Sequence, residues 1–219
     1  RLPPRPYTRP PRGGRSLLGL YIHIPFCRRV CPYCDFVRTA TPGAVPRTFT
    51  DALCQELRAF AGPDMAGTVF FGGGTPSLLT PDALGWILET VSQRFRLDAP
   101  EVTLEANPDD VTPELADAWR DLGVNRVSLG VQSFDDAVLR YLGRRHDARG
   151  SHAACDTVAE RFANWGMDLI FGAPPFDSWL ATLAACAAHE PKHVSAYGLT
   201  CEPGTPFEAR RHELPDDDT

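Results

Sequence analysis

The sequence predicts an α/β fold, a partial (βα)6 barrel of the TIM type. Short apolar strands alternate with helical segments along almost the whole chain, a pattern typical of a parallel sheet. Nothing in the series signals a reversal of strand order, and right-handed crossovers then favour a barrel or part of one. A complete barrel of eight units needs about 250 residues, whereas this chain has 219. Six units therefore fit the length better than eight.

Six strands and five helices support that count, with the sixth unit left open. The predicted strands span residues 18–24, 68–71, 102–106, 126–132, 167–171 and 193–199. The predicted helices span residues 49–60, 81–95, 112–123, 151–162 and 178–188. Thr80 followed by Pro81 is a typical helix start, and Gly123 is typical of the position just after a helix end.

The composition is that of a globular protein that spans no membrane. Hydrophobic residues make up 43% and charged residues 23%, both ordinary values. No apolar run approaches the roughly 20 residues of a transmembrane helix, and no signal peptide is recognisable. We therefore expect no transmembrane segment and a cytoplasmic location.

The net charge of −6 is unevenly distributed along the chain. Residues 1–16 contain five Arg and no acid, so the rest carries 17 basic against 28 acidic residues. An acidic body of this kind argues against nucleic acid as the main partner. Residues 1–16 are also rich in Pro, which predicts a disordered Pro/Arg-rich arm. Residues 17–208 are then the barrel domain, and 209–219 the start of a truncated C-terminal region.

Three of the seven cysteines lie in one loop directly after the first predicted strand. Cys27, Cys31 and Cys34 follow the spacing C-x3-C-x2-C, which directs three thiols toward one point. A zinc site usually has four protein ligands, and only Asp35 or His23 lies near enough to be the fourth. Three thiolates without a fourth would leave one iron of a [4Fe–4S] cluster open to another ligand. Zinc, a redox dithiol at Cys31 and Cys34, and unrelated buried cysteines remain alternatives. The other cysteines are predicted to be buried, inert thiols: Cys54, Cys155, Cys186 and Cys201.

The cysteine motif and its context resemble the radical S-adenosylmethionine (SAM) superfamily, whose fold is a partial (βα)6 barrel. The matching segments continue in order from residue 18 to the end of the chain. They are Tyr21-Ile-His-Ile-Pro-Phe-Cys27, Cys31-Pro-Tyr-Cys34-Asp-Phe36, Phe71-Gly-Gly-Gly-Thr-Pro76, Glu105-Ala-Asn-Pro108, Gly130-Val-Gln-Ser-Phe134, Asp168-Leu-Ile and Glu202-Pro-Gly-Thr-Pro-Phe207. Within the superfamily they resemble the group that contains oxygen-independent coproporphyrinogen III oxidase and the HemW heme chaperones.

The resemblance implies a [4Fe–4S] cluster on Cys27, Cys31 and Cys34, with SAM bound at the open iron. In this superfamily an electron from the cluster can cleave the SAM sulfonium bond, while the protein supplies orientation and a dry cavity. Ligand groups in barrels sit where the strands end, and several candidate residues fall there. The SAM-binding residues implied by the resemblance are Tyr21, Tyr33, Gly73, Gly74, Thr75, Glu105, Gln132, Arg144, Asp168 and Thr200. The turn after Asp168 is about two residues shorter than in the family.

Two functions stay open at this point. The oxidase branch has a further cysteine two residues after the last cluster ligand, and Phe36 occupies that position here. The sequence therefore resembles the HemW branch more closely. This resemblance implies that the protein carries heme and that its partners are heme-acceptor proteins and an electron donor. It also implies that the protein does not oxidise coproporphyrinogen. Whether SAM is cleaved stays open, and an oxidase-type oxidoreductase of porphyrin biosynthesis is the alternative. A His-Asn-x-x-Tyr-Trp segment associated with heme in that branch is absent from this chain.

Overall fold

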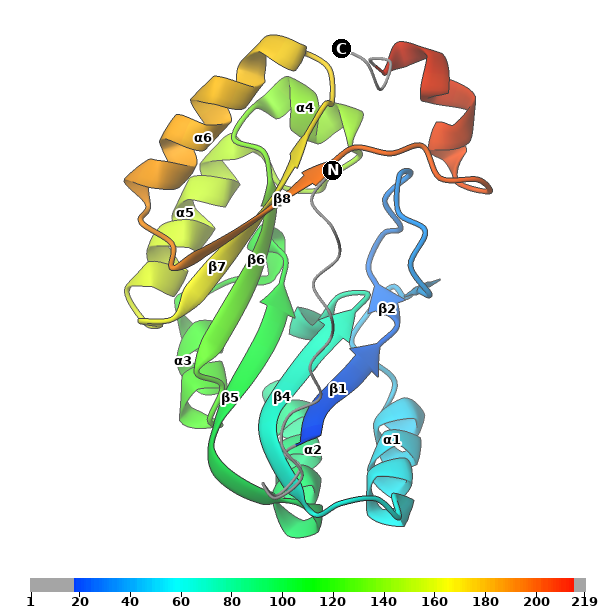
Figure 1. The fold of residues 1–219 in the computed structure, drawn as a ribbon, viewed down its shortest axis with the longest axis vertical. Helices are drawn as coiled ribbons and strands as arrows, with labels where there is room; N and C mark the ends of the chain where they lie inside the picture. Colours follow the sequence, from blue (N-terminus) through cyan, green and yellow to red (C-terminus); the bar gives the residue numbers. More distant parts are fainter. Residues whose placement is uncertain (1–17, 215–219) are drawn as a thin grey trace, which may run out of the picture.

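The computed structural model describes residues 18–214. Its six-stranded sheet is entirely parallel, in the order β1-β4-β5-β6-β7-β8. The strands curl into an open half barrel, with the main helices on its outer face (Figure 1). The predicted partial barrel of six units is therefore confirmed. The predicted arm at residues 1–16 lies outside the described residues.

The sheet strands are β1 (Leu18–Ile24), β4 (Met65–Gly73), β5 (Arg96–Ala106), β6 (Arg126–Gln132), β7 (Trp165–Phe171) and β8 (His193–Gly198). A separate two-stranded sheet contains β2 (Phe26–Cys27) and β3 (Thr39–Ala40). The α-helices are α1 (Arg47–Ala59), α2 (Pro81–Arg94), α3 (Pro113–Asp121), α4 (Asp136–Tyr141), α5 (Ala148–Ala159) and α6 (Trp179–Ala188). Short 3-10 helices are η1 (Pro76–Leu78), η2 (Pro108–Asp110), η3 (Phe176–Ser178) and η4 (Pro206–Glu213).

Local sequence signals set most helix starts. The hydroxyl of Thr80 accepts a hydrogen bond from the Ala83 amide at 3.2 Å, and Thr112 does the same for Leu115. Gly123 has a φ of +102°, in the left-handed region that glycine adopts without strain. The predicted caps are therefore present at both α2 and α3.

The structure differs from the predicted elements in three main ways, the first being that α5 (Ala148–Ala159) lies three residues earlier than the helix predicted at 151–162. β4 and β5 begin earlier than predicted, because backbone pairing between them continues past an irregularity at Ala66–Thr68. Helix α4 was not predicted, since six residues are too few to show a helical period. Its N-cap Asp135 accepts hydrogen bonds from two backbone amides, which is the local signal that could have revealed it.

The main core lies between the sheet and its outer helices. It joins residues from β1 to α6, with Phe71, Leu104, Trp119, Leu129 and Met167 among the fully buried side chains. No helix within residues 18–214 is long and apolar enough to cross a membrane.

The end of the described chain packs onto the cysteine loop. A second cluster joins α4, the end of β7 and η4 around Phe207, which is 1% exposed. The Phe207 amide donates to the Pro32 carbonyl at 3.2 Å, and its ring lies 6.1 Å from that of Tyr33. η4 therefore holds the cysteine loop from outside. The predicted domain boundary after residue 208 falls inside η4 and stays a prediction.

Candidate functional site

A cavity of about 530 Å³ lies at the carboxyl ends of the strands, facing the cysteine loop. Its volume is in the range typical of small-molecule sites. Twelve of the thirteen predicted site residues line it: Cys27, Cys31, Tyr33, Cys34, Gly73, Gly74, Thr75, Glu105, Gln132, Arg144, Asp168 and Thr200. The fold thus brings together residues that are up to 173 positions apart in the sequence.

The three loop cysteines are free thiols on one wall of this cavity. Burial raises the pKa of Cys27 and Cys34, and the neighbouring thiols add to the effect. A positive charge near Cys27 and Cys34 favours their thiolate forms, and the side chain of Arg38 already lowers the pKa of both thiols in this way. Within residues 18–214 no group of three or more His, Cys, Asp and Glu is arranged to hold one metal ion. A [4Fe–4S] cube is wider than one ion and takes each thiolate on a different iron, so this donor set fits it.

His23, a candidate fourth zinc ligand, is engaged elsewhere. Its Nε2 lies 2.9 Å from the Val37 carbonyl, and its Nδ1 lies 3.2 Å from the Tyr21 hydroxyl. His23 thereby links β1 to the end of the cysteine loop. Tyr21 is 60% exposed and is the one predicted site residue that does not line the cavity.

The glycine segment at the end of β4 is needed for close packing. A Cβ added at Gly74 would lie 2.8–2.9 Å from backbone atoms of Ile24 and Phe26, a distance that real Cβ atoms do not reach. Gly73 has a φ of +113° and donates its amide to Glu105 Oε2 at 3.2 Å. Both glycines therefore bring the end of β4 against the start of the cysteine loop.

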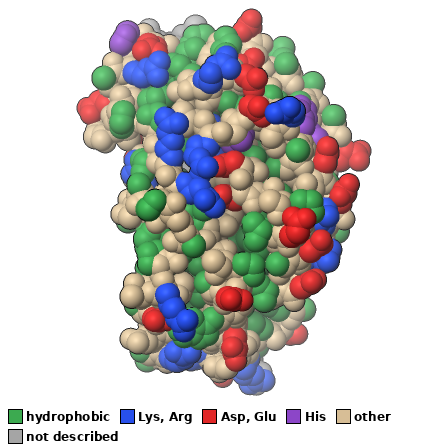
Figure 2. Space-filling view, turned by 180° about the vertical axis from the view of Figure 1, so that it is seen from behind, with side chains coloured by type: hydrophobic (Ala, Val, Ile, Leu, Met, Phe, Trp, Pro, Cys, Tyr) green, Lys and Arg blue, Asp and Glu red, His purple; other side chains and the backbone are tan. Residues whose placement is uncertain are grey.

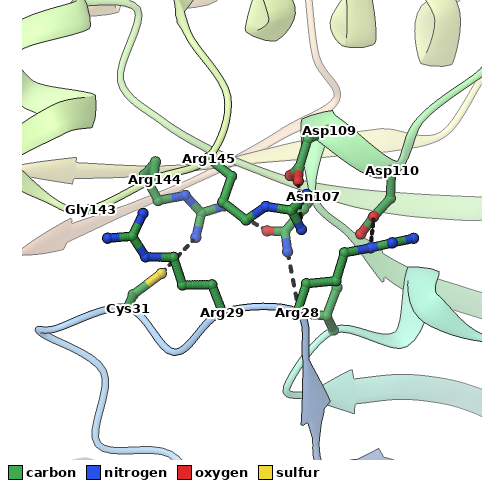
Figure 3. Close-up of a pocket in the computed structure, with 10 residues that line it drawn as sticks. Arg28, Arg29, Cys31, Asn107, Asp109, Asp110, Gly143, Arg144 and Arg145 are labelled. Carbon is green, nitrogen blue, oxygen red and sulfur yellow. Dashed lines mark hydrogen bonds and ion pairs between the residues drawn. The ribbon is translucent and has the colours of Figure 1, made fainter. Parts of the chain in front are cut away.

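Arg144 is held by several polar contacts beside the cysteine loop (Figure 3). Its Nη2 donates to Asn107 Oδ1 at 2.5 Å and to the Gly130 carbonyl at 2.9 Å. Its Nη1 lies 3.5 Å from both Cys31 Sγ and the Tyr33 hydroxyl. Its Nε is buried and has no hydrogen-bond partner in the described chain. An unsatisfied buried donor at this place fits an anionic ligand group.

The end of α4 positions Arg144. The Gly143 amide donates to the Arg140 carbonyl and the Arg144 amide to the Leu139 carbonyl, a Schellman motif. Gly143 has a φ of +68°, and a Cβ there would lie 2.8 Å from Pro32 Cδ. The unpredicted helix α4 therefore sets the guanidinium against the cysteine loop.

Two carboxyl groups line the cavity, Glu105 on β5 and Asp168 on β7. The pKa of Glu105 is raised to about 7, mainly by burial and also by the nearby Asp168, while the hydrogen bond from the Gly73 amide opposes the shift. Burial also raises the pKa of Asp168, although the Ser128 hydroxyl donates to it at 3.2 Å. Both buried carboxyl groups are therefore harder to ionise than free ones, and raised carboxyl pKa values of this kind are common at functional sites.

Gln132 ends β6 with a φ of +67°, a conformation that is unusual for a residue with a side chain. It coincides with an irregular register between β6 and β7 after Leu129. Backbone strain of this kind clusters at ligand sites. Thr200, two residues beyond β8, donates to Glu202 at the open rim of the cavity.

Asn107 and Tyr197 line the cavity but were not singled out from the sequence. Asn107 accepts from Arg144 and donates to the Thr75 hydroxyl at 3.2 Å, so it connects two predicted site residues. It belongs to the quoted Glu105–Pro108 segment, which was the available signal. Tyr197 lies on the edge strand β8, and no local pattern marked it.

Fold and site together define a class of protein: a partial (βα)6 barrel whose three-cysteine loop faces a polar cavity at the strand ends. The chain belongs to the radical SAM superfamily, whose sequence profile matches residues 21–184. Membership implies a [4Fe–4S] cluster and SAM as cofactors.

Several relatives are named heme chaperone HemW. The Escherichia coli protein is 40% identical over 209 residues, covering 92% of this chain and 55% of its own length. The Mycobacterium tuberculosis protein is 42% identical over 216 residues, with coverages of 91% and 55%. The chain thus spans about half the length of these relatives. Among solved structures, coproporphyrinogen III oxidase from Escherichia coli matches with a TM-score of 0.80 and 30% identity, over 92% of this chain and 49% of that one.

Proposed function

We propose that this chain is the radical SAM part of a heme chaperone of the HemW type, which binds heme and delivers it to acceptor proteins. The observation that carries the proposal is the meeting of three loop thiols with Arg144 and Glu105 at one cavity. The relatives named heme chaperone HemW, at 40–42% identity, support the choice within the superfamily. A cytoplasmic location, where thiols stay reduced, suits the seven free cysteines.

In this proposal Cys27, Cys31 and Cys34 hold the cluster, which supplies one electron when bound. Arg144 pairs with the SAM carboxylate through a charge-assisted hydrogen bond. Glu105 accepts from the SAM amino group. The remaining predicted contacts to the cofactor come from Tyr33, Gly73, Gly74, Thr75, Gln132, Asp168 and Thr200, whereas Tyr21 lies outside the cavity lining and is no longer proposed as one.

The cluster ligands can be tested one at a time. Anaerobic reconstitution should load one cluster per chain, and replacing Cys27, Cys31 or Cys34 by Ala should abolish its visible absorbance. Matched controls are Ala variants of the four remaining free cysteines, Cys54, Cys155, Cys186 and Cys201. An equal loss of absorbance in any of these controls contradicts the assignment.

The second candidate is an oxidoreductase acting on coproporphyrinogen III, which the structural match to the oxidase favours. Phe36 argues against it, because this side chain at the cavity rim is 64% exposed and has no thiol or ionisable group. Mass spectrometry of an anaerobic reaction with reconstituted protein, SAM, reductant and coproporphyrinogen III separates the two. We expect no protoporphyrinogen IX, and its formation over many turnovers would overturn the chaperone proposal.

Heme transfer is the positive test. The full-length protein should bind about one heme and pass it to an apo-acceptor, as measured by the shift of the heme absorbance band. The present chain alone should bind heme weakly or not at all. Tight, stoichiometric binding by this chain would place the heme site within residues 1–219.

A further inference from the structure

Two aspartates of η2 each hold an arginine from a different segment of the chain. Arg28 Nε lies 3.2 Å from Asp110 Oδ1, and Arg145 Nη1 lies 3.2 Å from Asp109 Oδ2. Figure 3 shows the two pairs next to the cysteine loop. The side chains of Asp110 and Asp109 are 4% and 18% exposed, whereas those of Arg28 and Arg145 are 45% and 41% exposed. The arginines therefore form an outer layer over the two acids.

Basic side chains on this molecule often have an acid beside them. On the face in Figure 2, Lys and Arg side chains gather in the upper part, and acidic side chains lie beside several of them. The two η2 pairs follow the same pattern. Positive charges that are compensated in this way attract a charged partner only weakly. The pairs therefore matter for what they hold in place.

Arg28 directly follows Cys27, the first cysteine of the loop. Its contact with Asp110 joins positions that are 82 apart in the sequence, and it is the only ion pair of Arg28 within residues 18–214. Because Arg28 and Cys27 share a peptide bond, a contact that fixes the Arg28 side chain also restricts the backbone at Cys27. Arg145, in contrast, is not next to a loop cysteine.

The Asp110 carboxylate is anchored from the inside of the molecule. Its Oδ2 accepts a hydrogen bond from the Ser77 hydroxyl at 2.8 Å. Ser77 lies in η1, after β4, and is 5% exposed. Both carboxylate oxygens therefore have a partner, Arg28 from the cysteine loop and Ser77 from η1. The segments that follow β2, β4 and β5 meet at this one carboxylate.

The same polar contacts return to the loop at a second cysteine. The Ser77 hydroxyl accepts a hydrogen bond from the Asn107 amide at 3.3 Å, and the Asn107 side chain accepts from Arg144. Arg144 Nη1 lies 3.5 Å from Cys31 Sγ. The contacts that begin at Arg28 therefore end at Cys31, so they hold the cysteine loop at two places.

The buried position of Asp110 is costly for a carboxylate. Burial raises its pKa, and the hydrogen bonds from Ser77 and Arg28 oppose this shift. Removing a carboxylate from water costs free energy that one ion pair often does not recover. Among the described residues, Arg28, Ser77 and Asp110 are also outside the lining of the large cavity, so contact with a ligand there does not explain them. What the pair supplies is a fixed position for the groups that it joins.

We propose that Asp110 is a positioning residue that, through Arg28, fixes the Cys27 end of the cysteine loop before the cluster is bound. The proposal rests on the proposed function, because that function assigns the loop to the cluster. Without the pair the loop would sample more conformations, and cluster binding would then have to order it. Breaking the pair should therefore make the metal-free loop more mobile and the bound cluster easier to lose.

The alternative is an ordinary surface ion pair, which contributes little. Asp109 and Arg145 supply that comparison within the same element. Their separation and the exposure of the arginine match those of Asp110 and Arg28, but no loop cysteine is next to Arg145. Asp109→Asn is therefore the matched control for Asp110→Asn.

The test uses the 219-residue chain in metal-free and reconstituted forms. The variants are Asp110→Asn, Arg28→Gln, the combination of both, and Arg28→Lys, which keeps the charge. Arg28 contacts Asp110 through Nε alone, so a lysine can replace it. Hydrogen–deuterium exchange of the metal-free chain measures loop mobility. Anaerobic transfer of iron to a chelator measures cluster loss, and electron paramagnetic resonance records the spectrum of the reduced cluster.

We expect residues 27–38 to exchange about tenfold faster in Asp110→Asn and in Arg28→Gln than in the wild type, with no change in β5 and β6. Both variants should also lose the cluster about tenfold faster, and the spectrum of their reduced cluster should broaden. The combined variant should be no worse than either single variant, because both remove the same contact. Arg28→Lys and Asp109→Asn should behave as the wild type.

Loop exchange in Asp110→Asn and Arg28→Gln that equals that of Asp109→Asn overturns the proposal, and so do additive effects in the combined variant. If Asp110→Asn exchanges faster over the whole sheet, it has lost the fold, and Arg28→Gln, at a half-exposed position, decides the matter alone. Failure of the wild type to load a cluster overturns the proposed function. The metal-free exchange distinguishes that result from a failure of the ion pair.

Discussion

At the scale of single residues, Arg144 has the most connected side chain of the site. It contacts Asn107, Gly130, Tyr33 and Cys31, and still keeps a buried Nε without a partner. The residue is thus fixed in place and retains a donor for a ligand. This combination is what a preorganised binding group requires.

Replacing Arg144 by Ala should weaken SAM binding. Loss of a charge-assisted hydrogen bond costs about 1.5–3 kcal/mol, which corresponds to roughly 10- to 150-fold in affinity. Titration of the reduced, cluster-loaded protein with SAM, followed by its paramagnetic spectrum, measures this change. Arg145→Ala is the matched control, because Arg145 lies on the outer surface and pairs with Asp109. Equal affinities in wild type and Arg144→Ala would remove Arg144 from the SAM site.

Glu105 should make the stability of the metal-free chain depend on pH. Its pKa is raised from 4.5 to about 7 by burial, so the folded chain retains a proton that the unfolded chain loses. The free energy of unfolding therefore falls as pH rises from 4.5 to 7. This loss of unfolding free energy is absent below pH 4.5 and complete above pH 7.

Urea unfolding of the wild type and Glu105→Gln at pH 5 and pH 8 tests this linkage. Between pH 5 and pH 8 the free energy of unfolding should fall by about 2–3 kcal/mol more in the wild type than in Glu105→Gln. Glu56→Gln, at an exposed position on α1, is the control and should behave as the wild type. Parallel pH dependence in wild type and Glu105→Gln would contradict the buried, protonated state.

At the scale of elements, the junction of β4 with the β1–β2 segment determines where the cysteine loop begins. Gly74 donates its amide to the Ile24 carbonyl at 2.8 Å, and its Cα lies directly against the backbone at Phe26. The junction therefore couples the glycine segment to the first cluster cysteine, Cys27. Any side chain at Gly74 would force the two segments apart.

Gly74→Ala should destabilise the chain by about 1–3 kcal/mol, the usual cost of overpacking. Gly43→Ala is the matched control, because a Cβ there meets nothing within 4 Å. The free energy of unfolding of this control should stay within about 0.5 kcal/mol of the wild type. Chemical denaturation of both variants gives the comparison. A Gly74→Ala protein as stable as Gly43→Ala would show that the junction can relax.

At the scale of the whole molecule, the half barrel leaves apolar side chains exposed on its last elements. β8 is an edge strand that pairs only with β7 within the described chain. Leu180 on α6 is 77% exposed, and Val194 on β8 is 41% exposed. An exposed edge with apolar residues promotes association between molecules.

The 219-residue chain should therefore self-associate as its concentration rises, and Leu180→Lys combined with Val194→Lys should reduce this association. Sedimentation velocity at increasing protein concentration measures the effect. Val37→Lys is the control, since Val37 is 78% exposed but lies in the cysteine loop. If the control reduces association as much as the double variant, the loop and not the edge mediates it.

The sequence by itself determined the number and order of the barrel units, the helix cap at Thr80, the helix end at Gly123, and the cysteine loop. These features depend on neighbouring residues, because hydrophobic period, capping and ligand spacing are all local properties. The observed β1 and β6 accordingly have the predicted bounds, Leu18–Ile24 and Arg126–Gln132. The motif residues also identified most of the cavity wall in advance.

Only the tertiary structure decided which of these residues meet. Arg144 reaches Cys31 across 113 positions, through a short helix too brief to show a period. Asn107 joins Thr75 to Arg144, whereas Tyr21 lies outside the cavity lining. The layering of arginines over Asp109 and Asp110 likewise depends on how two distant segments pack. Such contacts depend on the sheet register and on the curvature of the barrel. Both result from many strand pairings together, so no single segment of the sequence predicts them.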